Sequence, residues 1–185
     1  NAGSVPRLFA VSRPVEPHQP IAAASAFLRY ADPQRPLAWL RGDRGCVGVG
    51  EVLRLEFHGE DRFAEAVSAW HAIAAVSTVD DPIHLPGSGL IAFGTFAFDD
   101  HSSAVSVLIV PRVVFSQHGG RAWITEISLE PITGDPSQSN GLPHDRDFGE
   151  WSGVVLPTNV RDAAYLDGVA KATGLIEQGV VEKVV

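Results

Sequence analysis

The chain has 185 residues, 45% of them hydrophobic, which is enough for one sizeable core or for one core and part of a second. A formal net charge of -8 argues against nucleic acid or an anionic membrane surface as the main partner, and no apolar run approaches the roughly 18 residues that span a bilayer. The single Cys46 excludes an internal disulfide and, with no signal-peptide pattern at the N-terminus, indicates a cytoplasmic protein.

The first sixty residues predict short strands joined by turns. An Ala-rich stretch over residues 21–30 predicts a short helix. Apolar segments on either side of a turn at residues 41–45, which contains Gly and Asp, predict a hairpin. The expected strands cover residues 8–11, 37–40, 46–51 and 52–57.

The clearest helix of the first half begins at Asp61. Its apolar residues recur at i, i+4, i+7 and i+11, with two more beside them: Phe63, Val67, Trp70 and Ala74, flanked by Ala66 and Ile73. This spacing predicts an amphipathic helix whose stripe faces the core. A stretch rich in Asp, Pro and Gly over residues 80–89 ends this part of the fold.

The middle of the chain predicts an antiparallel meander. Three apolar, β-prone segments lie at residues 90–98, 104–115 and 121–129, with short turns between them. Together with the helices, these strands predict an α+β fold, a largely antiparallel sheet with flanking helices.

A polar stretch rich in Pro, Gly, Ser and Asn over residues 130–150 predicts a loop or linker. We therefore expect a scaffold subdomain over residues 1–157 and the start of a second domain over residues 158–185. The second part predicts a helix that Gly179 closes.

Lys183 lies in a β-branched run, residues 180–185, that predicts a buried strand. A lysine in such a run is either a solvated residue that protects the strand from aggregation or a desolvated base. A lysine accepts a proton only while its amine is neutral, which requires a pKa well below the reference of about 10.4. Because the chain stops inside this run, we expect it to be the front part of a longer protein.

The other chemistry-bearing residues have simpler interpretations. The glycines at residues 45–50 do not match the dinucleotide-binding pattern and fit a close-packed hairpin better. Cys46 fits a small core residue, and the acidic pair before Pro82 fits a turn. His101 beside Ser102 fits a loop, because adjacent side chains seldom act as base and nucleophile. The seven histidines lack metal-ligand spacing, so the chain offers no metal or cofactor ligand.

One series of motifs is more specific. Residues 94–99 read Gly-Thr-Phe-Ala-Phe-Asp, and they are followed by Ser102-Ser103 and by an apolar strand that ends in Pro111. With the C-terminal helix, its glycine stop and the Glu-Lys-Val-Val that follows, this order resembles the chorismate-utilising enzymes. Within them it most resembles the isochorismate synthases. The resemblance extends over nearly the whole chain and implies the N-terminal part of such an enzyme.

The resemblance implies a role for Lys183. In these enzymes the lysine of the Lys-Val-Val strand is the general base that activates water for attack at C2 of chorismate. Anthranilate and aminodeoxychorismate synthases, which deliver ammonia, usually carry glutamine there, so lysine favours water. The resemblance also implies Mg²⁺, held by glutamates that would lie beyond Val185 with the general acid, in the remaining C-terminal catalytic half. The product would enter menaquinone or siderophore synthesis.

Two alternatives remain open. A salicylate synthase shares the water-activating lysine and goes on to eliminate pyruvate. A non-catalytic binding or assembly module would instead carry Lys183 as a surface residue of an exposed final strand.

Overall fold

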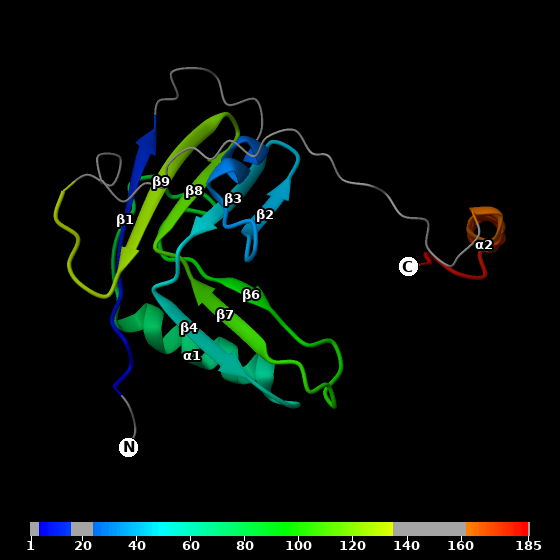
Figure 1. Cartoon of the computed structure of the whole chain (residues 1–185), viewed down its shortest axis with the longest axis horizontal. Helices are drawn as coiled ribbons and strands as arrows, with labels where there is room; N and C mark the ends of the chain where they lie inside the picture. The colour runs from blue at the N-terminus through cyan, green and yellow to red at the C-terminus, as the bar shows by residue number, and fades with distance from the viewer. Residues whose placement is uncertain (1–3, 16–23, 135–161, 185) are drawn as a thin grey trace. The chain divides into compact units, whose positions relative to one another are not determined.

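The computed structural model describes three stretches of the chain, residues 4–15, 24–134 and 162–184 (Figure 1). The chain divides into two compact units, Asn1–Asp147 and Phe148–Val185, called unit 1 and unit 2 below. The expected boundary at residue 157, and most of the expected loop at 130–150, lie outside the described residues.

Unit 1 is built around a six-stranded sheet in the order β2-β3-β8-β9-β1-β5. All neighbouring strands are antiparallel except β1 and β5, which run parallel. The strands are β1 (Phe9–Val15), β2 (Leu37–Arg41), β3 (Arg44–Val49), β5 (Thr78–Asp80), β8 (Val113–His118) and β9 (Arg121–Ser128). The predicted hairpin across residues 41–45 is therefore confirmed as β2-β3, and its turn begins at Gly42, whose φ is +60°.

A second sheet contains three antiparallel strands in the order β4-β7-β6. These are β4 (Leu53–Phe57), β6 (Phe93–Thr95) and β7 (Ser106–Val110). The single strand predicted over residues 104–115 is wrong, because the chain leaves this sheet at Pro111 and enters the six-stranded sheet as β8. Proline has no N–H for a strand ladder, and the next residue, Arg112, donates its N–H to the carbonyl of Val49 at 3.0 Å.

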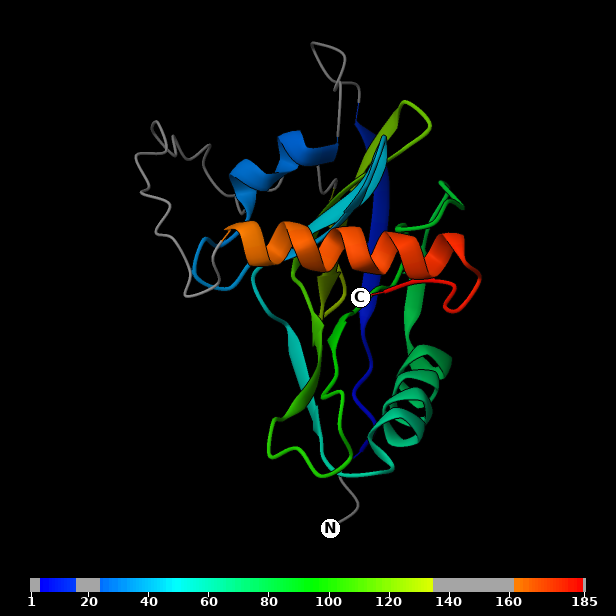
Figure 2. The same ribbon diagram turned by 90° about the vertical axis from the view of Figure 1, so that its right-hand side faces the viewer.

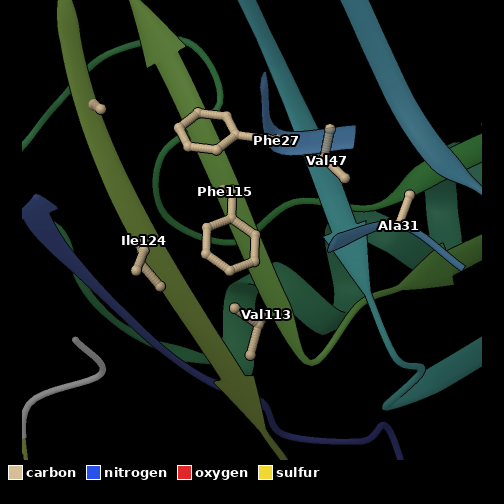
Figure 3. Close-up of a cluster of buried hydrophobic side chains, with 7 residues drawn as sticks. Phe27, Ala31, Val47, Val113, Phe115 and Ile124 are labelled. Atoms are coloured by element: carbon tan, nitrogen blue, oxygen red, sulfur yellow. The ribbon is translucent and has the colours of Figure 1, made fainter. Parts of the chain in front are cut away.

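The two faces of the six-stranded sheet carry separate cores. On one face the 3₁₀ helix η1 (Ala24–Tyr30) covers a cluster in which Phe115 stacks on Phe27 and Tyr30, with ring centroids 5.7 Å and 4.4 Å apart (Figure 3). The buried members of this cluster are Phe27, Ala31, Val47, Val113, Phe115, Ala122 and Ile124. The core of the other face is formed by Leu8, Ala10, Ile73, Val110, Val114 and Ile127. Successive residues of β8 alternate between the two cores, as the period of a strand requires.

The helix predicted from Asp61 is present as α1 (Arg62–Val76), but its predicted buried face is partly wrong. Ala66 and Ile73 are buried, whereas Phe63 and Val67 are 51% and 55% exposed. The helix buries the face that carries Arg62, Ala66 and Ile73. The predicted stripe that begins at Phe63 and Val67 therefore lies beside the buried face and not within it. In Figure 2 the blue η1 and the teal α1 lie at opposite ends of unit 1. Antiparallel sheets with flanking helices confirm the α+β class.

Candidate functional site

Unit 2 contains the helix α2 (Asp162–Glu177) and the residues that follow it. Gly179, with φ +70°, closes the helix as predicted. Its N–H donates to the carbonyl of Ile176 at 3.0 Å, and the N–H of Val180 donates to the carbonyl of Leu175 at 3.0 Å. This pair of hydrogen bonds is a Schellman motif, in which glycine takes the left-handed position at low cost.

Lys183 lies four residues beyond this glycine, and its predicted surroundings are wrong for the residues that the structure describes. Residues 180–184 form no strand, and Lys183 is exposed. Val180 and Val184 are also exposed, at 64% and 56%. A β-branched run becomes a strand only when a neighbouring strand completes its ladder, and no described strand pairs with these residues. The structure therefore shows the position of Lys183 but no buried environment for it.

The Gly-Thr-Phe-Ala-Phe-Asp segment of unit 1 is held by a buried arginine that sequence reasoning had not assigned. Arg62, at the start of α1, is 2% exposed. Its Nε donates to the carbonyl of Ala97 at 2.9 Å and its Nη2 donates to the carbonyl of Phe98 at 3.2 Å. Its Nη1 donates to the carbonyl of Gly59 at 2.8 Å and pairs with the carboxylate of Asp100 at 2.5 Å. We call these contacts the Arg62 clamp.

The Arg62 clamp ties the start of α1 to the loop that follows β6. The guanidinium lies 4.7 Å from the ring of Phe63, which itself stacks on Phe96 at 4.7 Å. Phe98, two residues further along, is fully exposed. A planar guanidinium with five donors can satisfy several carbonyls at once, which a lysine cannot do. A signal for this role was available, because Arg62 shares one helical face with Ala66 and Ile73.

Most of the remaining candidate residues have the structural roles expected of them, but Asp80 ends strand β5 (Thr78–Asp80) and pairs with Arg13 instead of lying in the predicted turn. The hydroxyl of Ser102 accepts the N–H of Ala104 at 3.1 Å, and the carboxylate of Asp99 accepts the N–H of His101 at 2.7 Å, so this loop uses its polar groups to form turns. Asp81 does the same by accepting the N–H of Ile83 at 3.0 Å. Cys46 is half-buried in β3, and burial raises the pKa of its thiol.

Sequence reasoning also missed a buried network of hydroxyl groups beneath the loop at residues 81–89. The hydroxyl of Ser12 accepts the N–H of Gly89 at 2.9 Å and lies 2.8 Å from the hydroxyl of Thr125. The carbonyl of Gly87 accepts the hydroxyl of Ser116 at 2.8 Å and the indole N–H of Trp123 at 3.0 Å. The side chains of this network point to the buried face of the sheet, where apolar residues are usual. Because their hydrogen bonds to the backbone of Gly87 and Gly89 are buried, they hold the loop in one position on the sheet.

Among the described residues, no group of three or more His, Cys, Asp or Glu side chains is placed to hold a metal ion. No helix in the described part of the chain is long and apolar enough to cross a membrane.

The described architecture is that of an α+β protein with two largely antiparallel sheets, in which the Arg62 clamp fastens the loop after β6 to the start of α1. Comparison with protein families extends this result, because the family model "chorismate binding enzyme" matches residues 2–185. The chain therefore belongs to the chorismate-binding enzyme family. Searches of curated proteins and of solved structures gave no significant match.

Proposed function

We propose that this protein takes part in the conversion of chorismate to isochorismate, with Lys183 as the base that activates the attacking water. The family match supports chorismate as the substrate. The identity of residue 183 is the observation that carries the finer assignment. The ammonia-using enzymes that the chain resembles usually carry glutamine at the matching position, so lysine supports water as the nucleophile.

In the proposed reaction the neutral amine of Lys183 takes one proton from water while the oxygen forms a bond to C2 of chorismate. The ring double bonds shift, and the bond between C4 and its hydroxyl breaks. A general acid protonates the departing hydroxyl, which leaves as water, so one water enters and one leaves. The overall reaction is therefore an isomerisation.

This role requires Lys183 to be shielded from solvent when chorismate is bound. Lys183 is exposed in the structure, so the shielding has to come from the bound substrate or from parts of the protein that pack on this segment. We propose Mg²⁺ as cofactor on the resemblance alone. The described residues do not supply a ligand set for it, so no step above depends on one.

The test is to incubate the intact gene product that carries this chain with chorismate and Mg²⁺, and to separate the products by chromatography. Isochorismate that acquires ¹⁸O from labelled water is the expected result. Salicylate with pyruvate would favour the salicylate synthase alternative. A folded protein that does not consume chorismate would overturn the enzymatic proposal and favour a binding module.

A further inference from the structure

Two tight hairpin turns close neighbouring pairs of strands in the six-stranded sheet. The β2-β3 turn has Gly42 at its first position with φ +60°, and the β8-β9 turn has Gly119 and Gly120 with φ +56° and +75°. Left-handed residues at these positions are typical of turns that join two strands through two residues, and the residues on either side of such a turn are direct cross-strand partners. The partners here are Arg41 with Arg44 and His118 with Arg121.

These four partners form one row across the end of the sheet, called the basic row below. Gly45 of β3 is paired with Gln117 of β8, so the next residues outward, Arg44 and His118, are neighbours at the end of this ladder. Successive residues of a strand point to opposite faces, so Arg44 shares a face with Cys46, which packs against the second of the two cores. The basic row therefore continues the face of that core to the end of the sheet, with one side chain from each of β2, β3, β8 and β9.

The basic row is unfavourable for the fold when nothing is bound to it. Like charges directly opposite each other on neighbouring strands destabilise a sheet, and Arg41 and Arg44 are such a pair. Arg121 adds a third guanidinium two strands away from Arg44. Asp43 is the one carboxylate in the two turns, and no ion pair between described residues involves it or the three arginines. In a chain with a net charge of -8, such a local excess of positive charge indicates a site for an anion.

The basic row is accessible and partly fixed in place. All four of its members are exposed or partly exposed. The guanidinium of Arg44 lies 5.7 Å from the ring of Trp39, a contact that orients the β3 side chain of the row. Two residues inward along β8 and β9, Ser116 and Trp123 donate to the carbonyl of Gly87, so the loop that contains Gly87 is held on the same face of the sheet. An anion on the row would meet a surface that is already arranged.

We propose that the basic row binds a small anion that carries two or more phosphate groups. Each guanidinium presents five N–H donors in a planar fork that matches phosphate oxygens, and the row has three of them. A phosphate group carries about -1.5 to -2 charges and three acceptor oxygens, whereas a carboxylate carries one charge and two oxygens. The row extends over three strand spacings, about 14 Å, so one phosphate group cannot contact it from Arg41 to Arg121.

The net negative charge of the chain disfavours a long polyanion such as nucleic acid, which leaves a small phosphate compound as the ligand. Because the row lies in unit 1, the proposal does not depend on the chemistry proposed for Lys183 in unit 2.

The test is isothermal titration calorimetry of the 185-residue chain with inorganic pyrophosphate at fixed ionic strength. The expected result is saturable binding at one site, which weakens as salt is added. Arg44→Gln and Arg121→Gln should each weaken binding by about tenfold or more, because each removes charged donors from the ligand. Arg54→Gln is the matched control, since it removes an arginine of unit 1 that lies outside the row and is paired with Glu51, and it should keep the affinity.

Arg41→Gln distinguishes a binding role from a structural one. It removes the like-charge pair with Arg44, so it should raise the midpoint of urea unfolding without ligand while it weakens pyrophosphate binding. Citrate tests the ligand class, because it presents carboxylates only and should bind more weakly than pyrophosphate by about tenfold or more.

The proposal is overturned if pyrophosphate shows no saturable binding, or if Arg54→Gln lowers the affinity as much as Arg44→Gln does. It is also overturned if citrate binds as tightly as pyrophosphate, or if Arg41→Gln lowers the unfolding midpoint without changing the affinity.

Discussion

Replacing Arg62 by methionine should destabilise unit 1, because the clamp joins α1 to the loop after β6 through one side chain. Methionine keeps most of the apolar stem and removes every donor. The carboxylate of Asp100 is 56% exposed and returns to water at little cost. The carbonyls of Gly59, Ala97 and Phe98 lose a charged donor.

The magnitude follows from those three carbonyls. A hydrogen bond contributes about 0.5–1.5 kcal/mol net, and more when the donor is charged. Because the loop is partly exposed, water replaces some of the lost bonds, so we expect a loss of about 2–4 kcal/mol in the free energy of unfolding. Arg62→Lys should recover less than half of this loss, since an ammonium lacks the fork that reaches three carbonyls.

The assay is urea unfolding followed by tryptophan fluorescence, with hydrogen exchange of residues 97–105 as a local readout. Arg54→Gln is the matched control, because it removes an exposed arginine paired with Glu51 and should leave the unfolding midpoint unchanged. A cost below about 1 kcal/mol for Arg62→Met, with exchange in the loop unaltered, would refute the reasoning that the clamp fixes this loop.

Three further changes test other parts of the fold. Gly45→Ala should cost about 2–4 kcal/mol in urea unfolding, because a Cβ there would lie 2.5 Å from the backbone oxygen of Trp39; an unchanged midpoint would contradict the close approach of β2 and β3. Cys46 should react far more slowly with a disulfide reagent in the folded protein than in urea, because burial raises the pKa of its thiol. The same shift contributes stability that is intact below the unfolded-state pKa of about 8.5 and lost as the pH rises through the folded value, so Cys46→Ala should reduce the alkaline decline in stability. A Cβ at Gly168 of α2 would meet no neighbouring atom, so Gly168→Ala should slow amide exchange in this helix by an amount equivalent to about 1 kcal/mol; unchanged or faster exchange would contradict this prediction.

The hairpin β2-β3, the helix α1 and the glycine stop of α2 could be predicted from the sequence because each depends on local signals. Gly42 supplies the turn, the apolar period supplies the helix, and Gly179 supplies the left-handed residue. These features require no knowledge of what packs against them.

The errors concern contacts between distant segments. The buried face of α1 is set by what the helix meets, and Phe63 and Ala66 differ in burial although both fit an apolar stripe. Residues 104–115 are divided between two sheets at Pro111. The residue after it, Arg112, bonds to the carbonyl of Val49, a contact between distant segments that the local sequence does not reveal. The strand expected around Lys183 needed a partner that residue types alone could not supply.

The candidate site was predictable only in part. The Phe-Asp segment could be recognised. The helical face that Arg62 shares with Ala66 and Ile73 could have indicated that Arg62 is buried, but not that it holds the carbonyls of Ala97 and Phe98. The buried hydroxyls of Ser12 and Thr125 were missed for the same reason, because their role depends on the loop at residues 81–89, which the Ser12 hydroxyl holds through the N–H of Gly89.

The most direct test of the proposed function is chorismate turnover with Mg²⁺ by the intact gene product and by two alanine variants. Lys183→Ala removes the proposed base, and Lys171→Ala removes the other lysine of the chain, which is exposed on α2. The account predicts that Lys183→Ala lowers kcat at least a hundredfold, the low end of what a general base contributes, while Lys171→Ala keeps nearly full activity. Equal activity in the two variants would contradict the assignment of Lys183.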